Sequence, residues 1–431
     1  MRPIDILFVH NNFPAQFRNL AMKFARMPGV RVKAISSPPA PGLSDVDMHR
    51  YRMPDMRRNT AHPFAKRFDV ECRRAEMVLY EAAQLKQAGF FPQVIYVHPG
   101  WGEALPLRNL FPDATLCTYS EFYYAPRGTD VGFDKEFDTF GVDGEVRISL
   151  RNASTLLALT DCDFSIAPTR WQYSVFPQEF RPKIHIVHDG LDFSKFALEP
   201  QRRATSIQGL DIAEEDEVIT FVSRSLEPYR GFHIFMRALP DILAARPRAR
   251  VLILGNDGVS YGAAPRQHAS WRNYMLDELG QHIDFSRVHF MGWVDYASYM
   301  AVLRRSDAHV YLTYPFVLSW SMLEAMALEC LVIGSDTPPV AEVITHEESG
   351  LLVPFFDRNA LANQIIDVLA EPERYRAIRR RARETVTSRY DFEASCWPKH
   401  VELLREYCYS RHVLNLLDKP VKTPASPRRH R

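Results

Sequence analysis

Short apolar segments alternate with helical segments along almost the whole chain, and this alternation restricts the fold more than any other feature. Apolar strands of this kind, separated by helices, are typical of parallel sheets that helices cover on both faces. The predicted strands form a first series at 4–9, 30–35, 93–98, 114–119, 163–169 and 183–190, and a second at 217–224, 250–255, 288–292, 308–313 and 331–335.

The two series of strands are separated by a polar stretch at 194–216, so we expect two doubly wound, Rossmann-like α/β domains. A chain of 431 residues also favours two domains. We place the first domain at 1–195 and the second at 205–385. A C-terminal helix at 386–415 is expected to pack back on the first domain. The Pro-rich basic end, 416–431, is predicted to be disordered.

Charge and cysteine content bound the class of protein. The net charge is +1, which gives no reason to expect a nucleic-acid partner. The six cysteines are scattered singly, which is typical of reduced, buried thiols in a reducing compartment. The N-terminus enters a strand directly, and no apolar run reaches the length of a membrane span. We therefore expect a cytoplasmic protein, with contact at the inner face of the membrane left open.

Ligands of open parallel sheets bind beyond the carboxyl ends of the strands, so the loops after the strands are the candidate sites. After the strand at 217–224 comes a turn in which Arg224 and Arg230 flank a proline, and Gly231 then opens a helix. Two guanidinium groups beside a helix N-terminus suit a diphosphate. The two arginines could equally be solvated surface residues.

The helix SWSMLEAMALE, residues 319–329, carries Glu324 among apolar neighbours. A buried carboxylate is costly unless a partner pairs with it. Ser319 and Ser321 lie near the expected N-cap, so their polar groups should face the same edge of the sheet. Glu324, one turn further on, could accept both hydroxyls of a ribose. It could also interact with the helix dipole and bind no ligand.

A third strand end carries His98, which Gly100 and Gly102 follow closely. The two glycines allow a close backbone approach, and the histidine could serve a reaction or only bond within its loop. The aromatic residues of the loop at 120–145 could stack on sugar rings or pack against the protein.

Metal and nucleotide motifs give little further support. Two D-x-D pairs, Asp45–Asp47 and Asp161–Asp163, have the spacing used by metal-dependent sugar transferases. The first lies in a Pro-rich loop and the second precedes its strand, so we interpret both as structural. Neither G-x-x-x-x-G-K-[ST] nor a clustered Cys/His pattern is present. We expect no metal and no separate cofactor.

Three ordered motifs resemble the retaining family-4 glycosyltransferases of the GT-B fold, as a divergent bacterial-type member. They are APTRWQYSVFPQEFRPKIHIVHDGLDFSKF at 167–196, SRSLEPYRGF at 223–232 and SMLEAMALECLVIGSDTPPVAEVITHEESGLLVPFFD at 321–357. Several ordered motifs on one chain are far more specific than any one of them. The resemblance implies two Rossmann-like domains whose parallel sheets face a cleft, an acceptor-side domain at 1–195 and a nucleotide-sugar-binding domain at 205–385.

The resemblance also implies roles for single residues. Glu324 matches the second glutamate of the family's E-x7-E element, which binds the donor's ribose. Arg224 matches the diphosphate-binding arginine, and Arg230 stands one residue late for the family's lysine. His98 matches a histidine near the transferred sugar. The amides of Ser319, Trp320 and Ser321 would approach the donor, and Gly255 and Gly292, which end two strands, are counted with the donor-binding residues.

The chain departs from the family pattern at three places. Phe316 stands where the family has the first glutamate of E-x7-E, which lies near the donor sugar. The Gly-Gly pair of the first loop is replaced by Ala15-Gln16-Phe17, and a later pair by Pro338-Pro339. These departures leave the identity of the donor open.

We therefore expect a metal-independent glycosyltransferase that moves a hexose or related sugar from a nucleoside diphosphate to an acceptor hydroxyl with retention. The expected partners are a nucleotide-sugar donor and a saccharide or lipid-linked acceptor of surface-polysaccharide or glycoconjugate synthesis, with no nucleic acid. Two alternatives stay open. One is a nucleotide-sugar epimerase on the same fold, and the other is a non-catalytic protein that binds sugar nucleotides.

Overall fold

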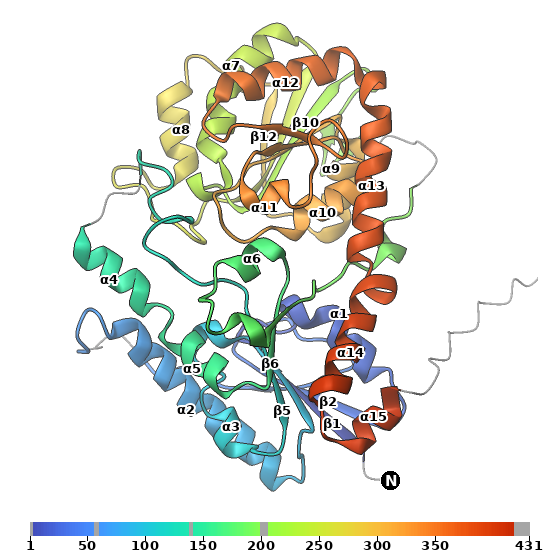
Figure 1. Ribbon diagram of the computed structural model, residues 1–431. Helices are drawn as coiled ribbons and strands as arrows, with labels where there is room; N and C mark the ends of the chain where they lie inside the picture. The colour runs from blue at the N-terminus through green and yellow to red at the C-terminus, as the bar shows by residue number, and fades with distance from the viewer. Residues whose placement is uncertain (1–2, 56–59, 138–140, 199–205, 418–431) are drawn as a thin grey trace, which may run out of the picture.

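The computed structural model describes residues 3–55, 60–137, 141–198 and 206–417. Two α/β domains lie one above the other, and the C-terminal helices run alongside both of them (Figure 1). Each domain is built on a parallel sheet, so the predicted α/β class with two Rossmann-like sheets is confirmed.

The sheet of the N-terminal domain has seven strands within the described residues, in the order β3-β2-β1-β4-β5-β6-β7, and every neighbouring pair is parallel. In that order the strands are Asp47–Arg50, Val30–Ser36, Ile4–Val9, Val94–Val97, Thr115–Tyr119, Phe164–Ala167 and Ile184–Ile186. The sequence analysis missed β3, because three of its four residues are polar and none of the four is buried at this edge of the sheet.

In the part of the chain that the structure describes, the sheet of the C-terminal domain has six parallel strands in the order β12-β11-β10-β13-β14-β15. In that order they are Val288–Gly292, Ala249–Asn256, Glu217–Ser225, Ala308–Tyr311, Val332–Ser335 and Leu351–Val353. A small antiparallel hairpin, β8 (Ser206–Ile207) with β9 (Leu210–Asp211), precedes this sheet. The hairpin lies within the polar stretch that separates the two predicted series of strands.

Helices connect the strands in both domains. The helices of the N-terminal domain are η1 (Ala15–Phe17), α1 (Arg18–Ala25), α2 (Lys66–Gln87), η2 (Pro99–Trp101), α3 (Leu107–Leu110), α4 (Val142–Leu150), α5 (Ala153–Asp161), α6 (Arg170–Ser174), η3 (Arg181–Lys183) and η4 (Phe193–Lys195). Those of the C-terminal domain are η5 (Pro228–Arg230), α7 (Phe232–Ala245), α8 (Trp271–Leu279), α9 (Tyr296–Arg305), α10 (Trp320–Ala327), α11 (Pro338–Ala341), α12 (Arg358–Ala370) and η6 (Pro372–Tyr375).

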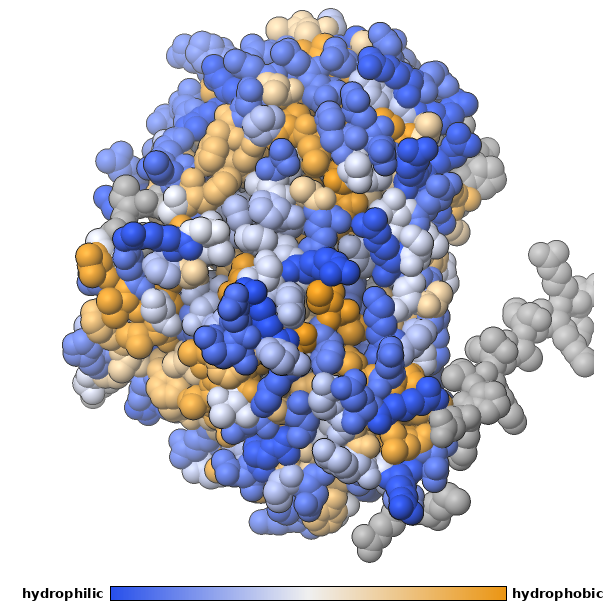
Figure 2. All heavy atoms as spheres, in the orientation of Figure 1, coloured by the Kyte–Doolittle hydropathy of each residue, from blue (hydrophilic) through white to orange (hydrophobic). Residues whose placement is uncertain are grey.

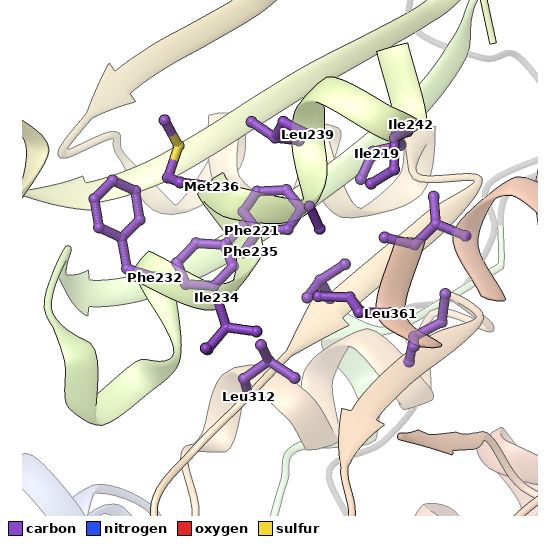
Figure 3. Close-up of a cluster of buried hydrophobic side chains, with 14 of the residues drawn as sticks. Ile219, Phe221, Phe232, Ile234, Phe235, Met236, Leu239, Ile242, Leu312 and Leu361 are labelled. Carbon is purple, nitrogen blue, oxygen red and sulfur yellow. The ribbon is translucent and has the colours of Figure 1, made fainter. Parts of the chain in front are cut away.

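The largest apolar core lies between the C-terminal sheet and helices α7 and α12 (Figure 3). Phe221 of β10 stacks on Phe235 of α7, with ring centroids 5.0 Å apart. Leu361 of α12 closes the same cluster. Because α7 is apolar on almost every side, it lies buried against the sheet and fixes the loop that leads into it.

The C-terminal helices join the two domains. Helix α13 (Arg376–Tyr390) packs in a core of the C-terminal domain through Ala382 and Val386. The next elements, η7 (Phe392–Cys396), α14 (Trp397–Tyr407) and α15 (Arg411–Leu417), belong to a core of the N-terminal domain. The predicted tail at 416–431 starts too early, because Leu416 is buried in α15. Residues 418–431 lie outside the described residues.

A second connection is made by the interdomain segment, residues 120–137, which follows β5 and reaches up to the C-terminal domain (Figure 1). Its Phe122 lies in the core cluster of that domain, and Phe133 and Phe137 pack against the cluster. The Tyr314 hydroxyl donates to the Asp134 carboxylate at 2.8 Å. Of the two interpretations of this loop, the structure therefore supports packing for its core-facing residues.

Glu342 links the domains at the start of α6. Its carboxylate oxygens accept from the backbone amides of Arg170 and Trp171, both at 2.7 Å, and so satisfy two free N–H groups of the helix. We expect Glu342→Gln to lower the free energy of unfolding by about 1 kcal/mol, because an amide N–H would then face a backbone donor. Denaturant titration measures the change. Glu348→Gln, at an exposed position without side-chain bonds, is the control, and an equal loss there would contradict the link.

Among the described residues, no helix is both long and apolar enough to span a membrane. The six cysteines are free thiols, and five of them are buried. The expectation of buried thiols is wrong for Cys72, which lies exposed on α2 because it falls on the solvent side of that amphipathic helix.

Candidate active site

A cleft of about 580 Å³ lies between the two domains, and residues at the carboxyl ends of strands from both sheets line it. Its C-terminal-domain wall includes Arg224, Ser319 and Glu324, and its N-terminal-domain wall includes Gln16 and Glu121. A smaller cavity of about 180 Å³, called the side cavity here, adjoins it and shares Glu121 and Arg224 with it. The strand-end rule therefore brings most of the predicted site residues to one place.

Glu324 lies one turn inside α10, which begins at Trp320. Its Oε2 accepts from the Tyr299 hydroxyl at 2.6 Å, and its Oε1 accepts from the Tyr296 hydroxyl at 3.3 Å. Burial raises the pKa of the Glu324 carboxyl above its usual value, and the two tyrosine hydroxyls partly oppose that rise. The protein partners of this carboxylate are therefore two tyrosines of α9, which the sequence analysis did not single out.

The N-terminus of α10 is capped as predicted. Ser319 is the N-cap, and its hydroxyl accepts from the amide of Ser321 at 3.3 Å. The Ser319 amide, however, already donates to the Tyr311 hydroxyl at 2.7 Å. Trp320 donates from its indole to Asp189 of the other domain at 2.8 Å. All three predicted residues line the cleft, but the Ser319 amide has a protein partner.

Arg224 and Arg230 differ in their surroundings. Arg224 lies within a register shift of β10 and is exposed to the cleft, and its guanidinium makes no hydrogen bond or ion pair with another described residue. Arg230 is buried, and its Nη1 donates to Thr313 at 2.7 Å and to the Val317 carbonyl at 2.9 Å. Arg224 is therefore available to a ligand, whereas Arg230 chiefly holds the loop at 313–317.

Gly231 explains how Arg230 and α7 follow one another so closely. Its φ is +66°, in the left-handed region that glycine adopts without strain. A Cβ at this position would lie 2.3 Å from Cβ of Leu312, so the backbone passes directly over the residue that follows β13.

His98 reaches the side cavity rather than the cleft itself. Its Nδ1 accepts from the Gly100 amide at 3.1 Å, which assigns the ring proton to Nε2. That nitrogen lies 3.2 Å from Oε2 of Glu121. The histidine is thus oriented by its own loop on one side and by a carboxylate on the other.

Glu121 is a cleft residue that the sequence analysis missed. Its Oε1 accepts from Gln16 at 2.7 Å, and its Oε2 faces His98. Burial alone would raise its pKa, but the hydrogen bonds from His98 and Gln16 outweigh burial and hold the pKa below the usual value. Its place directly after β5 was a signal, because the strand-end rule applies there as well.

Phe316 lies in an aromatic cluster. Its ring centroid is 4.7 Å from that of Phe122, 5.0 Å from that of Tyr261 and 5.5 Å from that of Tyr229. The indole of Trp171 donates to the Phe316 carbonyl at 3.1 Å. The position that carries a carboxylate in the family pattern is therefore an apolar contact between the domains here.

The two predicted strand-end glycines do not line the cleft. Gly255 packs against Leu226 and the Ser223 carbonyl, where a Cβ would lie 2.8 and 2.9 Å from the nearest atoms. Gly292, with φ +64°, turns the chain toward Trp293, which does line the cleft and is 77% exposed. An exposed indole beside a cleft can stack on a planar ring, so Trp293 is a further candidate that the sequence analysis missed.

Within the described residues, the side chains of Asp134, Glu136 and His233 bring possible metal ligands within 4.8 Å of one another. Both oxygens of Glu136 accept from Arg237, at 2.7 and 2.8 Å, and His233 lies 3.1 Å from Asp134. These three residues lie outside the lining of the cleft. Their contacts tie the interdomain segment to α7.

Two family models match the chain. The "Glycosyl transferase family 4 group" matches residues 28–196, and "Glycosyl transferases group 1" matches residues 202–385. A phosphatidyl-myo-inositol mannosyltransferase of Mycolicibacterium smegmatis is 28% identical over 48% of this chain and 48% of its own. A D-inositol 3-phosphate glycosyltransferase of Jonesia denitrificans is 25% identical over 40% of each chain. The chain therefore spans about half the length, or less, of these curated relatives.

Solved structures resemble the whole chain in fold. A sucrose-phosphate synthase from Thermosynechococcus elongatus superposes with a TM-score of 0.70 at 19% identity, over 94% of this chain and 98% of its own. The Anabaena protein HepE, in complex with UDP and glucose, superposes with a TM-score of 0.66 at 16% identity, over 94% and 100%. At these identities the likeness concerns the arrangement of the two domains.

Proposed function

We propose a sugar-transfer reaction for this chain, which belongs to the family-4 glycosyltransferases of the GT-B fold. The donor is a nucleoside-diphosphate sugar and the acceptor presents a hydroxyl group. One observation carries the proposal: Arg224, whose guanidinium has no partner among the described residues, and a half-buried carboxylate, Glu324, line the same interdomain cleft. A cation and a hydroxyl-binding carboxylate are the two groups that a nucleoside diphosphate needs.

The donor would lie along the C-terminal-domain wall. Glu324 would accept hydrogen bonds from the ribose hydroxyls, and Trp293 would stack on the base. Arg224 would bind the diphosphate beside the N-terminus of α10, whose dipole favours negative charge. Arg230 would add its positive charge to the attraction for the diphosphate from its buried position, while its hydrogen bonds fix the loop at 313–317.

The reaction would retain the anomeric configuration by front-face substitution. The bond from the sugar's anomeric carbon to the phosphate oxygen breaks, and a bond to the acceptor oxygen forms on the same face. The acceptor proton passes to the departing phosphate. Arg224 would stabilise the charge that develops on that phosphate, an electrostatic contribution for which the proposal needs no metal.

The acceptor would enter from the N-terminal-domain wall, where the His98–Glu121 pair lies. The pair would position the acceptor hydroxyl or the transferred sugar through hydrogen bonds. A role in polysaccharide or glycoconjugate synthesis is in keeping with the printed names of the relatives, which transfer sugars to phosphatidyl-myo-inositol and to inositol 3-phosphate.

A non-catalytic role in binding sugar nucleotides is the second candidate, because Phe316 replaces a carboxylate of the family pattern and lies in an aromatic cluster. Such a protein would bind a nucleoside diphosphate and turn over no donor. A nucleotide-sugar epimerase would instead form its product from the donor alone.

A thermal-shift screen of nucleoside diphosphates and their sugars tests the proposal. At a concentration of about 100 times its Kd, a nucleotide is expected to add about 2.7 kcal/mol to the stability of the protein and so raise its Tm. A transfer assay with the stabilising donor then separates the candidates, and the anomer of the product tests retention. If no nucleotide raises the Tm, the proposed function is wrong.

A further inference from the structure

The side cavity carries more positive charge than the donor proposal uses. Its lining includes the guanidinium groups of Arg67, Arg151 and Arg224, together with Glu121 and the ring of His98. Arg224 serves the donor on the cleft side. Arg67 and Arg151 come from the N-terminal domain, the expected acceptor side, and line the side cavity but not the cleft.

Arg151 lies in the turn between α4 and α5, and its guanidinium stacks on the ring of Tyr124 at 3.8 Å. Its Nε is buried and has no hydrogen-bond partner. Among the described residues none pairs with the rest of its guanidinium either. Arginine has five N–H donors, and leaving such donors unsatisfied inside a protein is costly. A bound ligand that accepts hydrogen bonds would therefore satisfy the free N–H donors of Arg151.

Arg67 is fixed at the same cavity. Its Nε lies 2.7 Å from Glu71, and its Nη2 donates to the Gly100 carbonyl at 3.1 Å. Burial lowers the pKa of Arg67, and the neighbouring positive charge of Arg151 lowers it further. Two guanidinium groups that repel each other across a cavity gain stability when an anion lies between them.

The nearby carboxylates already have partners. Glu71 accepts from the Ser154 hydroxyl at 2.6 Å in addition to its pair with Arg67. Glu121 is bonded to Gln16 and His98. Asp130 accepts from the Tyr229 hydroxyl at 2.9 Å. None of the three forms an ion pair with Arg151, so its charge is not neutralised by them.

We infer that Arg151, assisted by Arg67, binds a phosphate group of the acceptor, which makes the acceptor a phosphorylated alcohol rather than a neutral one. The inference rests on the proposed function, since it names the acceptor class of the same site. A phosphate held at the side cavity would leave a hydroxyl of the same molecule free to face Glu121 and the donor. Planar guanidinium groups suit this task because they bind phosphate oxygens two at a time.

The phosphate could belong to a soluble metabolite or to a lipid headgroup. Helix α4, which ends beside Arg151, exposes Val142, Val146 and Leu150 along one face, and Figure 2 shows apolar surface over this helix. A lipid would bring acyl chains to that face, whereas a soluble phosphate would not need it. The shared chemistry is the phosphate, and the test has one arm for each source.

Binding of phosphate probes to the full chain tests the inference. With the nucleoside diphosphate site saturated, we expect glycerol 3-phosphate, or phosphatidylcholine vesicles that contain phosphatidic acid, to bind to wild type. Glycerol and pure phosphatidylcholine vesicles should not bind. Arg151→Gln should weaken binding of the probe that binds to wild type, called the productive probe here, by at least about tenfold, because a charge-assisted hydrogen bond is lost. Arg147→Gln changes an exposed arginine of α4, one turn before Arg151, and is the matched control.

A second measurement needs no variant. Phenylglyoxal modifies accessible guanidinium groups, and the productive probe should protect Arg151 but not Arg147 in wild type. If only one of the two probes binds, the result supports the inference and shows whether the phosphate comes from a soluble molecule or from a lipid. Absence of binding in both arms, or equal weakening by Arg147→Gln, overturns it. Nucleotide binding without phosphate binding refutes this inference alone, and phosphate binding without nucleotide binding refutes the proposed function alone.

Discussion

Replacing Arg224 with glutamine is expected to lower kcat of sugar transfer by about 10²- to 10³-fold. Arg224 is the cleft arginine whose guanidinium has no partner among the described residues, so its charge is free to act on the donor. The negative charge on the phosphate grows as the sugar leaves. A fixed positive charge therefore stabilises the transition state more than the bound substrate, and its loss should affect kcat more than KM.

Two variants separate this effect from a loss of structure. Arg380→Gln changes an exposed arginine on α13, far from the cleft lining, and should leave kcat unchanged. Arg230→Gln removes two hydrogen bonds to the loop at 313–317 and one to the Tyr311 hydroxyl, so it should lower the Tm, whereas Arg224→Gln should not. A similar kcat for Arg224→Gln and wild type would refute the role of Arg224 in the transition state.

Much of the fold could be predicted from local pattern. Strands such as β1 and β10 are buried on both faces, so their sequences are near-continuous apolar runs, and such runs predict strands. The polar edge strand β3 and the two-residue strands β8 and β9 gave no such pattern. Among the described strands, β8 and β9 pair only with each other, and β3 pairs only with β2 at the edge of its sheet, so these short segments need no apolar run to be held in place.

The candidate site could be predicted where a side chain directly follows a strand or caps a helix. Ser319 and Glu324 are examples, because α10 has a fixed N-cap and a fixed turn length. The residues that surround them were not predictable in the same way. Tyr299 contacts Glu324 from a separate helix. His98 follows β4 and lies against Glu121, which follows the neighbouring strand β5. Such partners are set by tertiary packing rather than by spacing in the sequence.

The aromatic cluster around Phe316 explains why this position does not carry the glutamate of the family pattern. A glutamate at this position would lie among the rings of Phe122, Tyr229 and Tyr261, where an ionised group is costly. Glu121 of the N-terminal domain, whose carboxyl has a lowered pKa, lines the side cavity together with Phe316. On the proposed function, the carboxylate near the transferred sugar would therefore come from the N-terminal domain.

The ribose role of Glu324 predicts a specific dependence on the 2′-hydroxyl of the nucleotide. Wild type should bind a nucleoside diphosphate at least about tenfold more tightly than its 2′-deoxy form, because a hydrogen bond to a charged acceptor is lost. A carboxylate offers about four lone-pair positions, so each oxygen can accept from one tyrosine and from one ribose hydroxyl at the same time. The bonds from Tyr296 and Tyr299 thus orient the carboxylate without filling it.

Glu324→Ala should abolish this discrimination, so that both nucleotides bind equally weakly, and isothermal titration of the two nucleotides to both proteins measures it. Glu384→Gln, on an exposed face of α13, should discriminate as wild type does.

Because burial raises the pKa of Glu324, protonation on acidification removes the acceptor at a higher pH than for an ordinary glutamate. The preference for the ribonucleotide should therefore be full at neutral pH and fade as the pH falls. A preference that survives Glu324→Ala would assign ribose recognition to another group in the cleft.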